Sequence, residues 1–343
     1  MKKLLNTLYV TSPGAYISRE GETVLVTVNN EKKLRVPIHT LDGIVCFGQV
    51  ACSPPLMHLC GERNVAISFL NEYGKFLARV QGPVSGNVLL RREQYRRADD
   101  PEFSVKISRF IVIAKIANCR AVLLRAQRDH REKLNIGEIE GAVARLSRIA
   151  NKLRGDLSLD AIRGYEGEAA RVYFGVFDQL IVSNKEKFFF RERSRRPPMD
   201  NMNALLSFLY SILMHDVSSA LEGVGLDPAV GYLHRDRPGR PGLALDIMEE
   251  LRPVIAERLA LSLVNRRQVD GNGFTVTETG AVLMSDKTRK DVLVAYQKKK
   301  QEEIIHPFIK ERISIGLIPH IQAMLLSRFL RGDIEGYPPF LWR

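Results

Sequence analysis

The feature that most constrains the fold is a change in hydrophobic periodicity near residues 82–90. Before this point, short runs rich in Val, Leu, Tyr and Thr are separated by Pro- and Gly-containing turns, a pattern typical of β-strands. After Gly82-Pro83 and Ser85-Gly86, apolar residues recur at helical spacing. We therefore expect an α+β protein with a small N-terminal β-sandwich-like domain, residues 1–86, followed by a larger all-α domain, residues 87–343.

The same patterns predict where the individual elements lie. Strands are expected at residues 4–10, 16–18, 23–28, 34–37, 43–47, 65–69 and 76–80, with one helix at 53–63. Helices are expected to begin near Gly164 and Leu243, and to cover residues 103–127, 136–153, 202–221, 253–267, 289–301 and 308–330.

Charge indicates the kind of partner. The 343-residue chain has a formal net charge of +12 and a pI near 9.6, which favours a polyanion, with nucleic acid ahead of an anionic membrane surface. There is no apolar run of 18 residues, so neither a membrane-spanning helix nor a membrane partner is expected. The four cysteines form no CxxC pair, which predicts reduced core thiols in the cytoplasm and argues against a zinc site.

One stretch carries the chemistry most visibly: GYLHRDRPGRPGLALDIMEELRP, residues 231–253. On a helix, Asp246, Glu249 and Glu250 stand at i, i+3 and i+4, so their carboxylates lie close together and repel. A metal ion would relieve this repulsion, and His234 could complete such a site. The alternative is an acidic helix face in contact with water, beside a loop histidine that only forms hydrogen bonds.

A second stretch, GYEGEAARVYF at residues 164–174, places Glu166 between two glycines and is followed by the histidine and carboxylate segments. These motifs in this order resemble the CRISPR-associated spacer-acquisition integrases, the Cas-one family, over nearly the whole chain. In that family a Glu, a His and an acidic residue bind one divalent metal ion. Carried over, the metal ligands are Glu166, His234 and Glu249, and Asp246 joins them in the catalytic set.

The resemblance implies a metal-dependent DNA integrase and endonuclease. A 3′-hydroxyl of a short duplex, the spacer, attacks a phosphodiester of a CRISPR array, and water in its place gives DNA cleavage. The expected cofactor is Mg²⁺ or Mn²⁺, and an imidazole among oxygen ligands favours Mn²⁺ somewhat. The alternative function is a non-catalytic basic scaffold that only holds DNA.

Arginines near these motifs are the candidate DNA contacts. Arg235, Arg237 and Arg240 lie between two predicted ligands, where an entering phosphate would meet them, and Arg171 lies in the Glu166 segment. Arginine clusters also serve solubility alone, so this part of the hypothesis depends on where the structure places them.

Partners follow from the resemblance as well. It implies double-stranded DNA, a homodimer formed through the N-terminal domain, and a Cas-two dimer that bridges two such homodimers, in the cytoplasm of a prokaryote. Some subtypes add a Cas-four nuclease that trims the incoming DNA. The length of the chain and its ending RGDIEGYPPFLWR resemble such a subtype, the I-C-like branch.

Overall fold

The N-terminal part of the chain is a sandwich of two four-stranded sheets. The computed structural model describes residues 6–72, 74, 76–80, 82 and 88–342. The first sheet has the order β1 (Asn6–Val10), β5 (Leu41–Phe47), β7 (Ala66–Leu70), β8 (Phe76–Val80). The second has the order β4 (Glu31–Pro37), β3 (Thr23–Val28), β2 (Tyr16–Glu20), β6 (Ala51–Cys52). Helix α1 (Pro54–Glu62) completes this region, whose own core includes residues of both sheets.

Strand β5 shows how this region joins the rest of the protein. It pairs in parallel with β1 and β7, and both of its faces are buried, as is usual for parallel strands. Ile44 and Cys46 point into the sandwich core, whereas Val45 and Phe47 belong to the main core. The ring of Phe47 lies 5.9 Å from that of Phe208, so the first sheet rests directly on the helical region.

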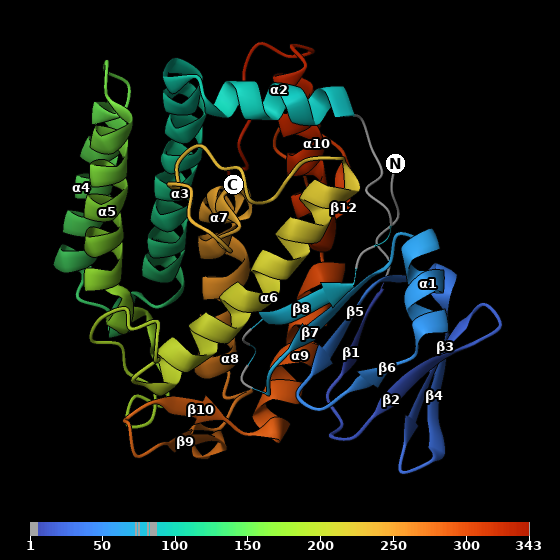
Figure 1. Cartoon of the computed structure of the whole chain (residues 1–343). Coiled ribbons are helices and arrows are strands. Elements are labelled where there is room, and N and C mark those ends of the chain that lie inside the picture. Colours follow the sequence, from blue (N-terminus) through green and yellow to red (C-terminus); the bar gives the residue numbers. More distant parts are fainter. Residues whose placement is uncertain (1–5, 73, 75, 81, 83–87, 343) are drawn as a thin grey trace.

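The rest of the chain is largely helical (Figure 1). Its helices are α2 (Val88–Ala98), α3 (Pro101–Asp129), α4 (Ile136–Lys152), α5 (Leu159–Gly175), α6 (Asn201–Gly223), α7 (Gly242–Leu251), α8 (Arg258–Asn265), α9 (Asp286–Gln301) and α10 (Ile318–Leu330). A π-helical turn, Arg252–Glu257, joins α7 to α8. Two short antiparallel pairs are β9 (Phe274–Val276) with β10 (Val282–Met284), and β11 (Glu303–Ile305) with β12 (Arg312–Ser314). The α+β fold class is thus confirmed.

Side-chain caps fix where the helices begin. The Asp100 carboxylate accepts hydrogen bonds from the backbone N–H groups of Glu102 and Phe103 at the start of α3, and Pro101 occupies the first helical position. Ser158 caps α5 in the same way, through the N–H of Ala161. These caps set the register of the two helices that later supply Lys115 and Glu166.

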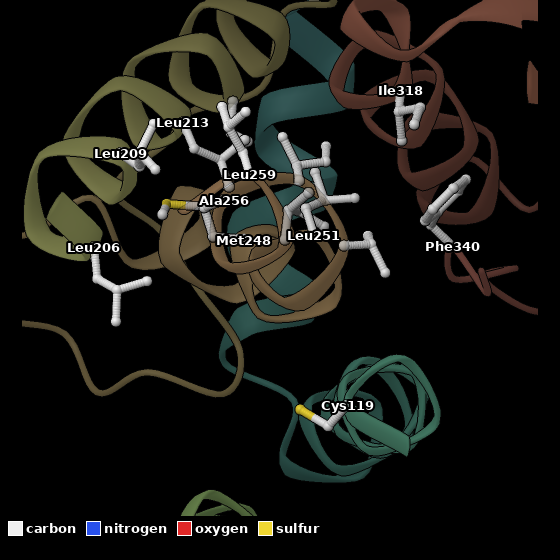
Figure 2. Close-up of a cluster of buried hydrophobic side chains, with 14 of the residues drawn as sticks. Cys119, Leu206, Leu209, Leu213, Met248, Leu251, Ala256, Leu259, Ile318 and Phe340 are labelled. Carbon is white, nitrogen blue, oxygen red and sulfur yellow. The ribbon is translucent and has the colours of Figure 1, made fainter. Parts of the chain in front are cut away.

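The segment from α7 to α8 runs through the middle of the helical core. Figure 2 shows it between leucines of α6 on one side and Ile318 of α10 on another, with Cys119 of α3 nearby. Helix α6 is long and apolar enough to cross a membrane by length and composition, yet most of it is buried inside the protein. Its apolar residues therefore serve as core, and α7 is held from several sides.

Several expectations about local structure were wrong. Glu166 lies in the middle of α5, because the helix begins at Leu159 rather than near Gly164. Residues 308–330 do not form one helix, since α10 begins only at Ile318 and β12 precedes it. The region that was expected to be all-α also contains the two short strand pairs. Helix α2 lies in the same region and was not among the expected helices. The predicted linker at 82–90 lies mostly outside the described residues.

Candidate active site

Asp246 holds the loop that carries His234. The backbone N–H groups of Tyr232 and Leu233 donate to its Oδ2 atom at 2.6 and 2.9 Å, and that of His234 donates to Oδ1 at 3.0 Å. The ring Nδ1 of His234 lies 2.6 Å from the same Oδ1. A carboxylate only accepts, so Nδ1 carries a proton, and the ring nitrogen that can offer a lone pair to a metal ion is Nε2. Asp246 thus positions the imidazole.

Two glycines allow this loop to lie against the first turn of α7. A Cβ on Gly231 would lie 2.7 Å from the carbonyl carbon of Gly242 and 2.9 Å from Asp246 Oδ2. A Cβ on Gly242 would lie 2.7 Å from the carbonyl oxygen of Ala229. Any side chain here would separate the loop from Asp246, so both glycines are required by close backbone approach.

Lys115 of α3 joins the two predicted carboxylate ligands. Its Nζ atom forms a hydrogen bond and ion pair with Glu166 Oε1 and lies 2.6 Å from Glu249 Oε2. Lys115 is 8% exposed and Glu249 3% exposed, so water does little to separate these charges. Three helices, α3, α5 and α7, therefore meet at one ammonium group. Burial lowers the pKa of Lys115, but attraction to Glu249 and Glu166 outweighs this effect and raises it above the usual value.

Two cations, Lys115 and Arg252, contact Glu249. Besides Lys115, the Nη1 atom of Arg252 lies 2.5 Å from Glu249 Oε1, and His234 Nε2 lies 3.9 Å from that oxygen. Burial alone would raise the pKa of Glu249, but Arg252 and Lys115 outweigh it and hold the pKa well below its usual value. The expectation that the carboxylates of α7 repel one another was therefore wrong. The alternative of a water-facing acidic surface was wrong too, since Asp246, Glu249 and Glu250 are all buried.

Glu250 points to the other side of α7. Its carboxylate accepts hydrogen bonds from the Tyr337 hydroxyl, from the backbone N–H of Phe340 at 2.6 Å and from Gln322 Nε2 at 3.2 Å. Burial raises the pKa of Glu250 to about 7, against the opposing effect of these donors. Glu250 thus fastens the C-terminal segment to α7 and takes no part in the group around Lys115.

A small cavity adjoins this group. It has a volume of about 20 Å³, and its lining includes Lys115, Arg193, Tyr210, Arg252 and Glu257. The π-helical turn brings Glu257 to this side, where the hydroxyl of Tyr210 donates to its Oε1 at 2.5 Å. Within the described residues, Oε2 of Glu257 and the Nε atoms of Arg193 and Arg252 have no hydrogen-bond partner. Buried polar atoms of this kind need a partner, and the space suits a small polar group.

The donor set fits a divalent cation. His234 offers Nε2, Glu249 Oε2 is buried without a well-directed hydrogen bond among the described residues, and Glu166 lies across Lys115 from it. One imidazole and two carboxylates suit Mg²⁺ or Mn²⁺. In the part of the chain that the structure describes, no three His, Cys, Asp or Glu side chains are grouped closely enough to hold a metal ion. In the structure, the ammonium group of Lys115 lies between two of the three proposed ligands, Glu166 and Glu249.

The predicted DNA contacts divide into two groups. Arg235 and Arg237 are exposed in the loop after His234, and Arg240 is half-buried at its end. Partial burial lowers the pKa of Arg240, and the positive charge of Arg237 lowers it further, with smaller effects from Arg195 and Arg163. Such mutual repulsion favours an anion nearby. Arg171 is exposed on α5.

Sequence reasoning missed Lys115, Arg252 and Glu257. The signal for Lys115 was a charged residue inside a helix that is apolar around most of its circumference, a position where charge is rarely placed without a partner. Arg252 and Glu257 flank Pro253 and its π-helical turn, and a proline cannot supply the N–H that a regular helix needs.

These features define a class of protein: a β-sandwich joined to a helical domain in which two carboxylates, an imidazole and a lysine lie together, beside a loop that carries arginines. The family described as "CRISPR associated protein Cas1" matches residues 8–298. The chain is 53% identical to "CRISPR-associated endonuclease Cas1 1" of Chlorobaculum tepidum and 51% identical to "CRISPR-associated endonuclease Cas1 2" of Rhodospirillum rubrum, with both chains covered completely in each case. It belongs to the Cas1 family of CRISPR-associated endonucleases.

Further similarities concern architecture. The chain is 33% identical to a "CRISPR-associated exonuclease Cas4/endonuclease Cas1 fusion" of Geobacter sulfurreducens, over 98% of this chain and 60% of the fusion. Among solved structures, a CAS1 protein from Thermotoga maritima matches with a TM-score of 0.81 at 24% identity, over 95% of this chain and 97% of that one. A casposase bound to integration product matches with a TM-score of 0.84 at 21% identity, over 99% and 95%. At these identities the two structures show a shared fold.

Proposed function

We propose that the protein is a metal-dependent DNA integrase that inserts short duplexes into a CRISPR array and also cleaves DNA. The observation that supports the proposal is the position of Glu249, which lies 3.9 Å from His234 Nε2 and is joined to Glu166 through Lys115, with the His234 ring oriented by Asp246. Imidazole orientation by a second carboxylate is typical of metal ligands. The group lies at the end of an arginine-rich loop, where a phosphodiester would be met by cations.

In this reaction the 3′-hydroxyl of the incoming strand forms a bond to phosphorus, and the bond to the existing 3′ oxygen breaks. The attacking hydroxyl loses a proton and the leaving oxygen gains one, so a phosphodiester is exchanged without an outside energy source. His234, Glu249 and Glu166 would hold Mg²⁺ or Mn²⁺, which stabilises charge on the phosphate oxygens. Arg235, Arg237 and Arg240 orient the backbone phosphates, and Asp246 keeps the imidazole in place.

Partners are proposed on the same basis. Relatives include Cas4/Cas1 fusions, and structures of similar fold include a Cas6-RT-Cas1–Cas2 complex, of which this chain covers 36%. We propose double-stranded DNA as substrate, a homodimer through the β-sandwich, a Cas2 dimer as bridging partner and a Cas4 nuclease as an accessory. The four cysteines are free thiols, consistent with a prokaryotic cytoplasm.

The test uses Glu166→Gln, His234→Ala and Glu249→Gln. Each should abolish strand transfer of a labelled duplex into a supercoiled repeat plasmid with Mn²⁺ and the Cas2 partner, while DNA binding persists. Gln is chosen because Glu249→Ala would leave Arg252 buried without its ion-pair partner, at a cost of about 3 kcal/mol, and an amide oxygen can still accept from Arg252. Full activity in all three variants would refute the metal site.

A non-catalytic DNA scaffold remains a second candidate, and one observation favours it. Lys115 and Arg252 already neutralise the buried carboxylates, so the cluster has a structural explanation without any metal ion. The two candidates differ in a simple measurement on the protein without DNA. The integrase binds Mn²⁺ stoichiometrically and loses this binding in His234→Ala, whereas the scaffold shows no specific Mn²⁺ binding.

A further inference from the structure

Lys115 takes a place that the proposed cofactor also needs. Its ammonium contacts the carboxylates of both Glu166 and Glu249, and those three side chains come from three different helices. A cation that binds the same two carboxylates comes within a few ångströms of this ammonium, and like charges at that separation repel strongly at a buried site.

The charge balance of the site also indicates that Lys115 and a divalent ion do not fit there together. In the structure, the two negative charges of Glu166 and Glu249 face the two positive charges of Lys115 and Arg252. A divalent ion adds two more positive charges, which one incoming phosphodiester offsets only by half. A buried group with such an excess is costly unless one of the cations moves away.

The adjoining cavity supplies a destination for the lysine. Lys115 and Glu257 both line it, and Glu257 Oε2 has no well-directed hydrogen bond among the described residues, although the Tyr173 hydroxyl interacts with the Glu257 carboxyl. A lysine side chain is a flexible four-carbon chain with a compact charge, so it can change partners without movement of the backbone. The structure therefore offers Lys115 two carboxylate positions, one at Glu166 and Glu249 and the other at Glu257.

We propose that Lys115 is an internal counter-ion: it holds Glu166 and Glu249 together in the metal-free protein and moves to Glu257 when a divalent ion binds. The inference rests on the proposed function, because it requires a metal ion at Glu166, His234 and Glu249. It assigns to Lys115 and Glu257 positioning roles, since neither needs to touch the reacting atoms.

The main test measures Mn²⁺ affinity by the electron paramagnetic resonance signal of free Mn²⁺, on the whole protein without DNA. Lys115→Met removes the competing cation and should bind Mn²⁺ about tenfold more tightly than wild type. Glu257→Gln removes the charge that receives the displaced ammonium and should bind about threefold more weakly. Lys300→Met is the matched control, because Lys300 is also buried and paired, 2.9 Å from Asp216, but contacts none of the proposed ligands.

The possible outcomes distinguish the counter-ion role of Lys115 from the proposed metal site itself. If wild type binds Mn²⁺ and Lys115→Met binds it equally or more weakly, the counter-ion inference is overturned and the metal site stands. If wild type itself shows no specific binding, the metal site and the inference both fail. A tighter Lys115→Met with unchanged Lys300→Met supports the inference, because a purely structural role for Lys115 would weaken binding.

A second measurement covers the case in which Lys115→Met does not fold. Wild-type protein with ¹³C-labelled lysine is titrated with Mg²⁺ and followed by NMR. The Lys115 signal, assigned by its loss in Lys115→Arg, should shift as Mg²⁺ saturates the protein. A Lys115 signal that stays in place at saturation overturns the displacement.

Discussion

The 2.6 Å contact between His234 Nδ1 and Asp246 Oδ1 joins a loop to a buried helix and determines which ring nitrogen is available. Asp246 also receives three backbone N–H groups from the same loop. One carboxylate therefore fixes both the path of the loop and the tautomer of the imidazole. This arrangement gives Asp246 a role different from that of Glu249, although both lie on α7.

Asp246→Ala should destabilise the protein and abolish strand transfer. It leaves three buried N–H groups without an acceptor, and at about 1–3 kcal/mol for each the loss of unfolding free energy should be at least about 3 kcal/mol. Asp246→Asn should cost less stability yet still weaken Mn²⁺ binding, because an amide N–H in place of the acceptor disturbs the His234 tautomer. Urea unfolding and Mn²⁺ titration check this, with exposed Asp129→Asn as control. Unchanged Mn²⁺ affinity in Asp246→Asn would contradict it.

Glu250→Ala should be strongly destabilising, although Glu250 points away from the proposed metal ligands. Its removal leaves the Tyr337 hydroxyl and the Phe340 N–H without their buried acceptor, a cost of about 2 kcal/mol or more, whereas Gln322 keeps the Tyr337 hydroxyl and the Pro338 carbonyl as acceptors. Thermal unfolding gives the change in stability. Protein that remains folded should keep Mn²⁺ binding, and a folded variant with no Mn²⁺ binding would place Glu250 in the metal site.

His215 should make stability depend on pH in the acidic range. Burial, helped by Arg79, lowers the pKa of His215 to about 4, while an unfolded histidine titrates near 6.5. Both states are neutral above pH 6.5, so His215 has no effect there. As pH falls from about 6.5 to 4, only the unfolded state takes up the proton, and up to about 3 kcal/mol of stability is lost. Urea unfolding at pH 7.5, 6 and 5 should show a flatter profile for His215→Gln than for wild type or exposed His58→Gln.

Replacing Arg235, Arg237 and Arg240 together with Ala should weaken DNA binding and its salt dependence. In a plot of the logarithm of the DNA-binding constant against the logarithm of the salt concentration, each lost phosphate contact makes the slope shallower by roughly 0.9. We expect a loss of between about two and three contacts, because Arg235 already pairs with Asp160 at 3.0 Å. Fluorescence anisotropy with a short duplex at several salt concentrations gives the slope. The control removes the same amount of positive charge from β4, by changing Lys32, Lys33 and Arg35 together to Ala. An equal effect on DNA binding in this control would show that only net charge matters.

The sequence by itself determined the order of the two regions and most of their elements. The alternation of strands before residue 82 and the helical spacing afterwards are local properties, so they can be read from neighbouring residues. Helical spacing also placed Asp246, Glu249 and Glu250 close together, but this expectation was wrong for Glu250, which is about 100° from Glu249 around the helix and contacts Tyr337 and Phe340 instead. Candidate ligands came from the motif resemblance rather than from periodicity.

Only the tertiary structure decided what surrounds those candidates. Lys115 reaches Glu166 and Glu249 because α3, α5 and α7 pack together, and no spacing along the chain encodes that meeting. Glu250 is buried by Tyr337 and Phe340, residues far along the chain whose position depends on the C-terminal segment folding back onto α7. Local patterns fix which way a side chain points, whereas its charge partner and its access to water depend on elements distant in sequence, and these set both pKa and role.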